Sequence, residues 1–176
     1  MEGAKQSDGQ PLVRTVGKEV IADIGNTCVL MRTRLISRVI TGIYNEKLRP
    51  FGIGSAQFAL LVVICQIEPA TRAKIGRSQH QHRSILTRNL KVILSEGWVE
   101  EIPDQADGRS RPIALTKAGI DLLLKAESAW QAAQAQAKAL LGKDGTIAVM
   151  DIANRIIGST SRSMKHTVGD GSSHAV

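Results

Sequence analysis

The sequence predicts a mainly α-helical fold that carries one short β-hairpin. Apolar residues recur at the three- and four-residue spacing of amphipathic helices, both before residue 97 and after residue 116. Between these regions, two short apolar runs flank the turn-rich segment 103–108, a pattern typical of a hairpin. Aromatic residues make up 3% of a chain that is 43% hydrophobic, so the predicted core consists of Leu, Ile, Val and Ala.

The N-terminal part is predicted to be an arm followed by a helix. Residues 1–25 are rich in Gly, Gln, Asp and Lys, and we expect a flexible N-terminal arm. Asn26 or Thr27 can cap a first helix that continues to about Arg49. Pro50 and the glycine two residues later end this helix.

A second helix is predicted from Ser55 to about Ile67. Its run Phe58 to Ile64 is apolar on all sides, so we expect this helix to be central. The β-branched residues of the run would also suit a buried strand, but the length favours a helix. Cys65 directly follows the run and is expected to be a small core residue.

Residues 71–95 carry a one-sided positive charge. The segment contains six Lys or Arg and no Asp or Glu, in a chain whose net charge is +7. Thr71 can cap a short helix to about Ser78, and Gln79–Gln81 links it to a basic helix that Gly97 ends. Such a patch attracts polyanions, and two short helices with a tight link are typical of a helix-turn-helix.

The basic helix has two different faces when residues advance by about 100° each. The polar face carries Ser84, Thr87, Arg88 and Lys91, and the opposite face carries Leu86, Leu90, Ile93 and Leu94. An α-helix fits the major groove of DNA, where Arg and Lys pair with guanine and Ser or Thr contact phosphates or bases. A solvated surface helix is the alternative interpretation of this pattern.

The predicted hairpin follows directly. Trp98 to Ile102 forms its first strand and Arg111 to Leu115 its second, which Pro112 confines to an edge or interrupts. Arg109 and Arg111 lie near its tip, where they are either ordinary surface charges or contacts to the minor groove or phosphates. A hairpin after a helix-turn-helix makes a winged arrangement.

The C-terminal third is predicted to be helical. Thr116 caps a long helix to about Leu141, Gly142 stops it, and a last helix spans roughly residues 146–157. Residues 158–176 are expected to be a disordered tail. We therefore expect one domain, 26–157, in which 50–115 is the winged helix-turn-helix. Residues 26–49 and 116–157 form a helical dimerisation region, although a monomeric bundle is the alternative.

Other candidate sites are weaker. His80 and His82 have no adjacent third ligand, so we expect no metal site and no cofactor. Cys28, with Arg32 one turn on, is a candidate redox residue at the start of the first helix. No nucleotide-binding or nucleophile motif is present, which argues against an enzyme. No signal peptide or run of roughly 20 apolar residues occurs, so we expect a cytoplasmic protein without membrane contact.

Several strings in order resemble the MarR family of bacterial winged-helix transcriptional regulators. These strings are LRPFGIGSAQFALL, RSILTRNLKVILSEGWVEE, DGRSRPIALTKAGIDLL and AWQAAQAQ, and together they cover about residues 28–141. The resemblance implies a homodimer that binds pseudo-palindromic duplex DNA, often as a repressor that a small ligand releases. His82 departs from the family pattern, since it stands where a capping Asp is usual.

By matched position, the resemblance places one set of residues on the recognition helix and one in the wing. Ser84, Thr87, Arg88 and Lys91 are the expected DNA-binding residues of the helix, Arg109 and Arg111 those of the wing, and Asp107 shapes the wing. Arg83, in the basic segment, is a further DNA-binding candidate. The predicted function is a sequence-specific, homodimeric repressor released from double-stranded DNA by a small-molecule effector. The alternative is a redox or small-molecule sensor, using Cys28, that acts mainly through a protein partner.

Overall fold

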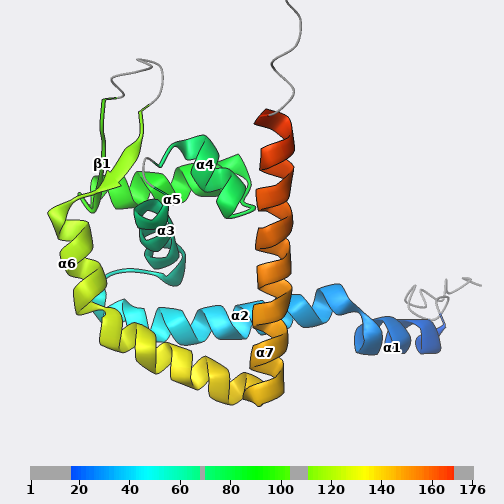
Figure 1. Cartoon of the computed structure of the whole chain (residues 1–176). Coiled ribbons are helices and arrows are strands. Elements are labelled where there is room, and N and C mark those ends of the chain that lie inside the picture. Colours follow the sequence, from blue (N-terminus) through cyan, green and yellow to red (C-terminus); the bar gives the residue numbers. More distant parts are fainter. Residues whose placement is uncertain (1–16, 68–69, 104–110, 169–176) are drawn as a thin grey trace, which may run out of the picture. The chain divides into compact units, whose positions relative to one another are not determined.

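The computed structural model describes residues 17–67, 70–103 and 111–168 of the chain (Figure 1). Side chains are described up to residue 158. Contacts divide the chain into two units, residues 1–40 and residues 41–176, which are described separately.

The first unit contains a helix that the sequence did not predict. Helix α1 spans Lys18–Thr27, so the expected arm of residues 1–25 is wrong from residue 18 onward. Val20, Ile21 and Ile24 lie at helical spacing, and Glu19 in the first turn suits the positive end of the helix dipole. The short apolar patch was therefore the start of an amphipathic helix.

A break at Cys28 separates α1 from α2 (Val29–Leu48). Cys28 has extended backbone angles, φ −65° and ψ 109°, although it carries no turn signal in the sequence. The Arg32 guanidinium donates hydrogen bonds to the carbonyls of Gly25 at 3.0 Å and Asn26 at 3.2 Å. A cation from the next helix thus satisfies carbonyl oxygens at the end of α1. The helix predicted from residue 26 to about 49 is therefore α2, which begins at Val29.

In the second unit, α2 ends as predicted. A 3₁₀ turn, η2 (Arg49–Phe51), follows it, and Gly52 adopts φ 71°, which favours glycine. Helix α3 (Ser55–Gln66) comes next and buries Leu60, Leu61 and Ile64. It contacts α4, α5, α6 and β2, which confirms a central helix rather than a strand.

The prediction for Cys65 is wrong, because this thiol is exposed. Cys65 lies in the last turn of α3, beyond the buried residues, so the apolar run extends further than the core. The described residues contain no single helix that is long and apolar enough to cross a membrane. A bent pair, Val29–Phe51 with Ser55–Gln66, passes by length and composition, but it includes the core helix α3.

Two helices and the hairpin follow in the predicted order. Helix α4 spans Arg72–Ser78, α5 spans Arg83–Ser95, and the strands are β1 (Val99–Glu101) and β2 (Ile113–Leu115). The strands are antiparallel, with Val99 opposite Leu115 and Glu101 opposite Ile113. Pro112 lies just before β2, where its carbonyl accepts from the Ile102 amide at 2.8 Å, so it limits the strand as predicted.

The hairpin is also joined to the segment before α4. The Ile113 amide donates to the Ala70 carbonyl at 3.0 Å, and both residues are fully buried. Leu48, Ile75, Leu90 and Ile93 belong to the same core cluster. The helix-turn-helix and the base of the hairpin therefore share one core.

The predicted long helix is two helices. Helix α6 (Lys117–Lys125) begins at Thr116, whose side chain accepts from the Gly119 amide, and it ends at Ala126. No glycine or proline marks this break. Ala126 is fully buried there, so the break coincides with tertiary packing. Helix α7 (Glu127–Val168) is interrupted at Gly142, with φ 68° and ψ 178°, as the sequence predicted.

The helical chain resumes directly after Gly142 and continues to Val168. The expected disordered tail, 158–176, is therefore wrong for residues 158–168, and residues 169–176 lie outside the described part. On the first part of α7, Ala133 and Ala137 are buried, and the Tyr44 hydroxyl donates to the Gln134 side chain. Small alanines thus permit close helix packing here.

Candidate nucleic-acid interface

Helix α5 separates its two faces as the sequence predicted. Leu86, Leu90 and Ile93 are buried against the core. All five predicted DNA-binding residues of the helix have exposed side chains, and these are Arg83, Ser84, Thr87, Arg88 and Lys91. The helix therefore presents three cations and two hydroxyls to solvent from an apolar base that fixes its orientation.

Two polar side chains of α5 make hydrogen bonds within the protein. Asn89 is 6% exposed, and its Oδ1 accepts from Gln57 Nε2 of α3 at 3.5 Å, a contact that sequence reasoning missed. The Thr87 hydroxyl donates to the Arg83 carbonyl at 2.8 Å. This hydroxyl is thus used within the helix and remains able to accept a hydrogen bond.

The turn between α4 and α5 has an unusual backbone. His80 adopts φ 47°, the one positive φ among the described residues other than glycine. The Gln81 amide donates to the Gly76 carbonyl at 3.4 Å, which closes the end of α4. His82 precedes α5 and makes no side-chain capping bond, as its mismatch with the family pattern implied.

We expect His80→Val to destabilise the protein because a β-branched residue is strained in the left-handed region. The free energy of unfolding should fall by about 1–2 kcal/mol. His80→Asn is the matched control, since asparagine tolerates positive φ, and it should leave stability near that of the parent. Urea unfolding measures both variants, and equal stability of the Val variant would show that the turn adopts another conformation.

A groove lies between α4 and α5, with a volume of about 730 Å³. Its polar lining includes Arg72, Arg77, Gln81 and Arg83, and its apolar lining includes Leu86 and Leu90. The groove is continuous with the exposed face of α5, because Arg83 and Thr87 belong to both. The combination of guanidinium groups and apolar surface suits an anionic partner.

An ion cluster connects α4 to the hairpin, at the end of β1 that leads to its tip. Glu101 on β1 pairs through Oε1 with Arg72 of α4 and through Oε2 with Arg111 at 3.6 Å. The hydrogen bond from Arg72 is the main cause that lowers the pKa of the Glu101 carboxyl from 4.5, and both guanidinium charges add to it. Arg111 is nevertheless 73% exposed, which leaves it accessible to a phosphate.

The role of Glu101 was not predicted. Its partners come from separate segments, so the sequence offers no spacing that would bring the three residues together. Asp107 and Arg109, the other predicted wing residues, lie outside the described residues. Cys28 is half-buried at the junction of α1 and α2, and the Arg32 guanidinium there bonds to carbonyl groups.

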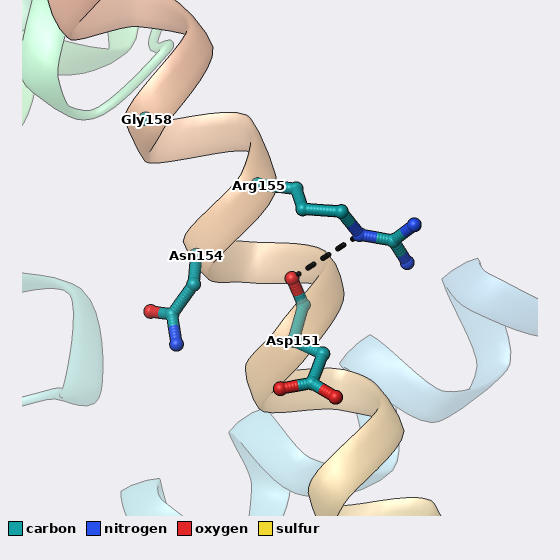
Figure 2. A pocket seen from close by; sticks show the side chains of 4 residues that line it. All are labelled: Asp151, Asn154, Arg155 and Gly158. Carbon is teal, nitrogen blue, oxygen red and sulfur yellow. Dashed lines mark hydrogen bonds between the residues drawn. The ribbon is translucent and has the colours of Figure 1, made fainter.

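A second hollow, of about 630 Å³, lies on α7 (Figure 2). Asp151, Asn154, Arg155 and Gly158 line it, all within two turns of one helix. The Arg155 Nε donates to the backbone carbonyl of Asp151 at 3.4 Å, so this contact stays within the helix. Among the described residues, no group of three or more His, Cys, Asp or Glu is arranged to hold a metal ion.

Known proteins with this architecture are transcriptional regulators. A mutant MarR of E. coli in complex with operator DNA matches 77% of this chain and 97% of its own, with a TM-score of 0.68 and 21% identity. At 21% identity, this match shows similarity of fold alone. No family model matches the sequence.

Two relatives are more similar in sequence. The Bacillus subtilis HTH-type transcriptional regulator YwoH is 32% identical over 81 residues, which span 46% of this chain and 58% of YwoH. The M. tuberculosis regulator MosR, solved in complex with DNA, is 32% identical and has a TM-score of 0.64. That match covers 78% of this chain and 98% of MosR. The winged helical fold and this likeness show that the chain belongs to the MarR family of transcriptional regulators.

Proposed function

We propose that the protein is a homodimeric repressor that binds a pseudo-palindromic site in duplex DNA and is released by a small-molecule effector. Helix α5 enters the major groove, where Arg88 and Lys91 contact bases or phosphates and Arg83, Ser84 and Thr87 assist. Arg109 and Arg111 contact the minor groove or the backbone, and Asp107 shapes the wing. The protein acts in the cytoplasm by binding rather than by catalysis.

The observation that carries this proposal is the exposed polar face of α5 opposite a buried, mainly apolar face. Its cations are exposed while Leu86, Leu90 and Ile93 are buried, so the helix can approach DNA without unfolding. MosR, at 32% identity, was solved in complex with DNA. The net charge of +7 favours association with any polyanion, so the proposal of sequence-specific binding depends on α5.

The dimer is supported by exposed apolar side chains. On α2, Met31, Leu35 and Val39 follow one another at four-residue spacing and are 51%, 46% and 42% exposed. On α7, Val149, Ile152 and Ile156 are 40%, 50% and 49% exposed, also on one face. Such stripes typically mark protein interfaces. A second copy would cover them and would place two α5 helices about 34 Å apart, one DNA turn.

The position of the groove between α4 and α5 supports release by an effector. An anionic molecule that occupied it would lie against Arg83 and Thr87 and would compete with DNA for them. The alternative function, a sensor that uses Cys28 and a protein partner, has no comparable observation. It would gain support if the protein failed to select a DNA sequence.

We expect Arg88→Ala to lose specific DNA binding. A bidentate contact from arginine to guanine contributes about 1–3 kcal/mol, so affinity for a selected site should fall roughly 5- to 150-fold. Sites are selected from a randomised duplex pool at near-physiological salt, and affinities are then measured by fluorescence anisotropy.

The matched control is Arg155→Ala, which removes the same charge from the exposed surface of α7. This variant should bind the selected site like the parent. Enrichment of a two-fold symmetric sequence by the parent supports the dimeric regulator. Equal affinity of parent and Arg88→Ala would reject the role of α5, and absence of any enrichment would reject sequence-specific binding.

A further inference from the structure

Glu101 occupies an unexpected place for an acidic residue. It is the last residue of β1 and lies between Arg72 and Arg111, next to a groove that should face DNA phosphates. Its two carboxylate oxygens are divided between the two arginines, with Oε1 toward Arg72 and Oε2 toward Arg111. One carboxylate therefore holds two cations that come from different elements.

Stability does not explain this arrangement well. The side chains of Arg72 and Arg111 are 47% and 73% exposed, and exposed ion pairs contribute little to stability because water and salt screen them. A negative charge here also weakens the attraction of this surface for DNA. The carboxylate instead restricts the orientation of the two arginine side chains, since a guanidinium held by a partner samples fewer positions than a free one.

The backbone supports the same conclusion. Arg72 comes two residues after Ala70, which bonds to Ile113, and Ile113 pairs with Glu101. Arg111 comes two residues before Ile113. Each arginine is thus two residues from the buried bridge between Ala70 and Ile113, and Glu101 holds their long side chains beside it.

We propose that Glu101 is a positioning residue that determines DNA specificity by holding Arg72 and Arg111 in one orientation, an inference that rests on the proposed DNA-binding function. An arginine side chain that nothing holds can move to reach a phosphate on any duplex. An arginine held by Glu101 contacts a phosphate only when the protein is bound in one register along the DNA. Glu101 therefore limits binding to non-specific DNA more than it limits binding to the operator.

The chain offers a matched control on the same strand. Glu100 is the neighbouring residue of β1, is exposed, and lies on the other face, because successive strand residues alternate. Glu100→Gln and Glu101→Gln change the net charge equally and at almost the same place. A difference between them isolates the ion cluster from simple charge removal.

The experiment measures affinity for the selected operator and for a scrambled duplex over about 50–200 mM salt. In Glu101→Gln, we expect at least a tenfold fall in the ratio of specific to non-specific affinity. Non-specific binding should become stronger, and its salt dependence should steepen by about 0.9 for each arginine that gains a phosphate. Glu100→Gln should leave the affinity ratio unchanged.

A second variant tests whether Glu101 acts through Arg111. In an Arg111→Gln background, Glu101→Gln should change the affinity ratio less than it does in the parent, because the two residues are energetically coupled. In the DNA-free protein, the Nε–H proton signals of Arg72 and Arg111 should broaden in Glu101→Gln and persist in Glu100→Gln. This NMR readout reports positioning independently of DNA.

The outcomes separate this proposal from the proposed function. If the parent prefers the operator and the two glutamine variants behave alike, Glu101 contributes only charge and the positioning role is wrong. If the ratio stays that of the parent in Glu101→Gln, the role is also wrong, whereas the DNA-binding function stands. A parent that shows no preference for any sequence overturns both.

Discussion

Gly119→Ala should unfold much of the winged region, or lower its stability by about 3 kcal/mol or more. Gly119 lies in the first turn of α6, and a Cβ built there would overlap the Trp98 carbonyl oxygen and lie 3.0 Å from its carbon. This contact is with backbone, so no side-chain rotation relieves it. We expect Tm to fall by roughly 10 °C in thermal unfolding monitored by circular dichroism.

The backbone around Gly119 explains why relief is difficult. The Trp98 carbonyl accepts from the Thr116 amide at 3.1 Å, and the Thr116 hydroxyl donates to the Gly97 carbonyl at 2.6 Å. Movement of α6 away from Trp98 would break these bonds. The fixed approach of α6 to the start of β1 therefore requires glycine at this position.

Gly76→Ala is the matched control for this prediction. A Cβ at Gly76, within α4, would meet Leu86 Cδ2 at 3.5 Å, an ordinary contact. Alanine also favours a helix over glycine by about 0.5–1 kcal/mol, so this variant should be as stable as the parent or more stable. A Gly119→Ala protein that unfolds at the parent temperature would show that α6 does not approach Trp98 so closely.

Leu35→Glu should convert the protein from dimer to monomer. Leu35 is the centre of the apolar stripe on α2, and a dimer interface that covered it would have to bury an unpaired carboxylate. We expect the dimer dissociation constant to rise at least 100-fold, which is about 3 kcal/mol. Sedimentation equilibrium measures the change directly.

Ser37→Glu is the control for charge and helix position. Ser37 is exposed and lies about 200° around α2 from Leu35, so its carboxylate points away from the stripe. This variant should remain a dimer and bind the selected operator normally. A Leu35→Glu protein that stays dimeric would place the interface elsewhere, and a parent that is monomeric would reject the homodimer itself.

The sequence was sufficient for elements with a strong local signal. The opposed faces of α5, the caps at Thr71 and Thr116, and the glycines at positions 97 and 142 were all predicted and are present. Each depends on the side chain or the backbone freedom of a few neighbouring residues. The orientation of Arg88 and Lys91 toward solvent belongs to this group, because helical periodicity alone decides it.

The sequence did not predict helix breaks and helix continuations that no glycine, proline or capping residue marks. Ala126 interrupts a predicted helix without glycine or proline, and α7 continues through residues predicted to be a tail. An apolar run also does not reveal where the core ends, as the exposed Cys65 shows. These features depend on which surfaces the neighbouring elements cover.

The sequence by itself determined the helical class, the hairpin and the polar face of α5, because these follow from spacings of two to four residues. Only the tertiary structure decided that Glu101 meets Arg72 and Arg111, that Asn89 is buried against Gln57, and that α6 touches the Trp98 backbone. The physical reason is distance along the chain. These partners are 10 to 32 residues apart in sequence, and the shared apolar core brings their elements together.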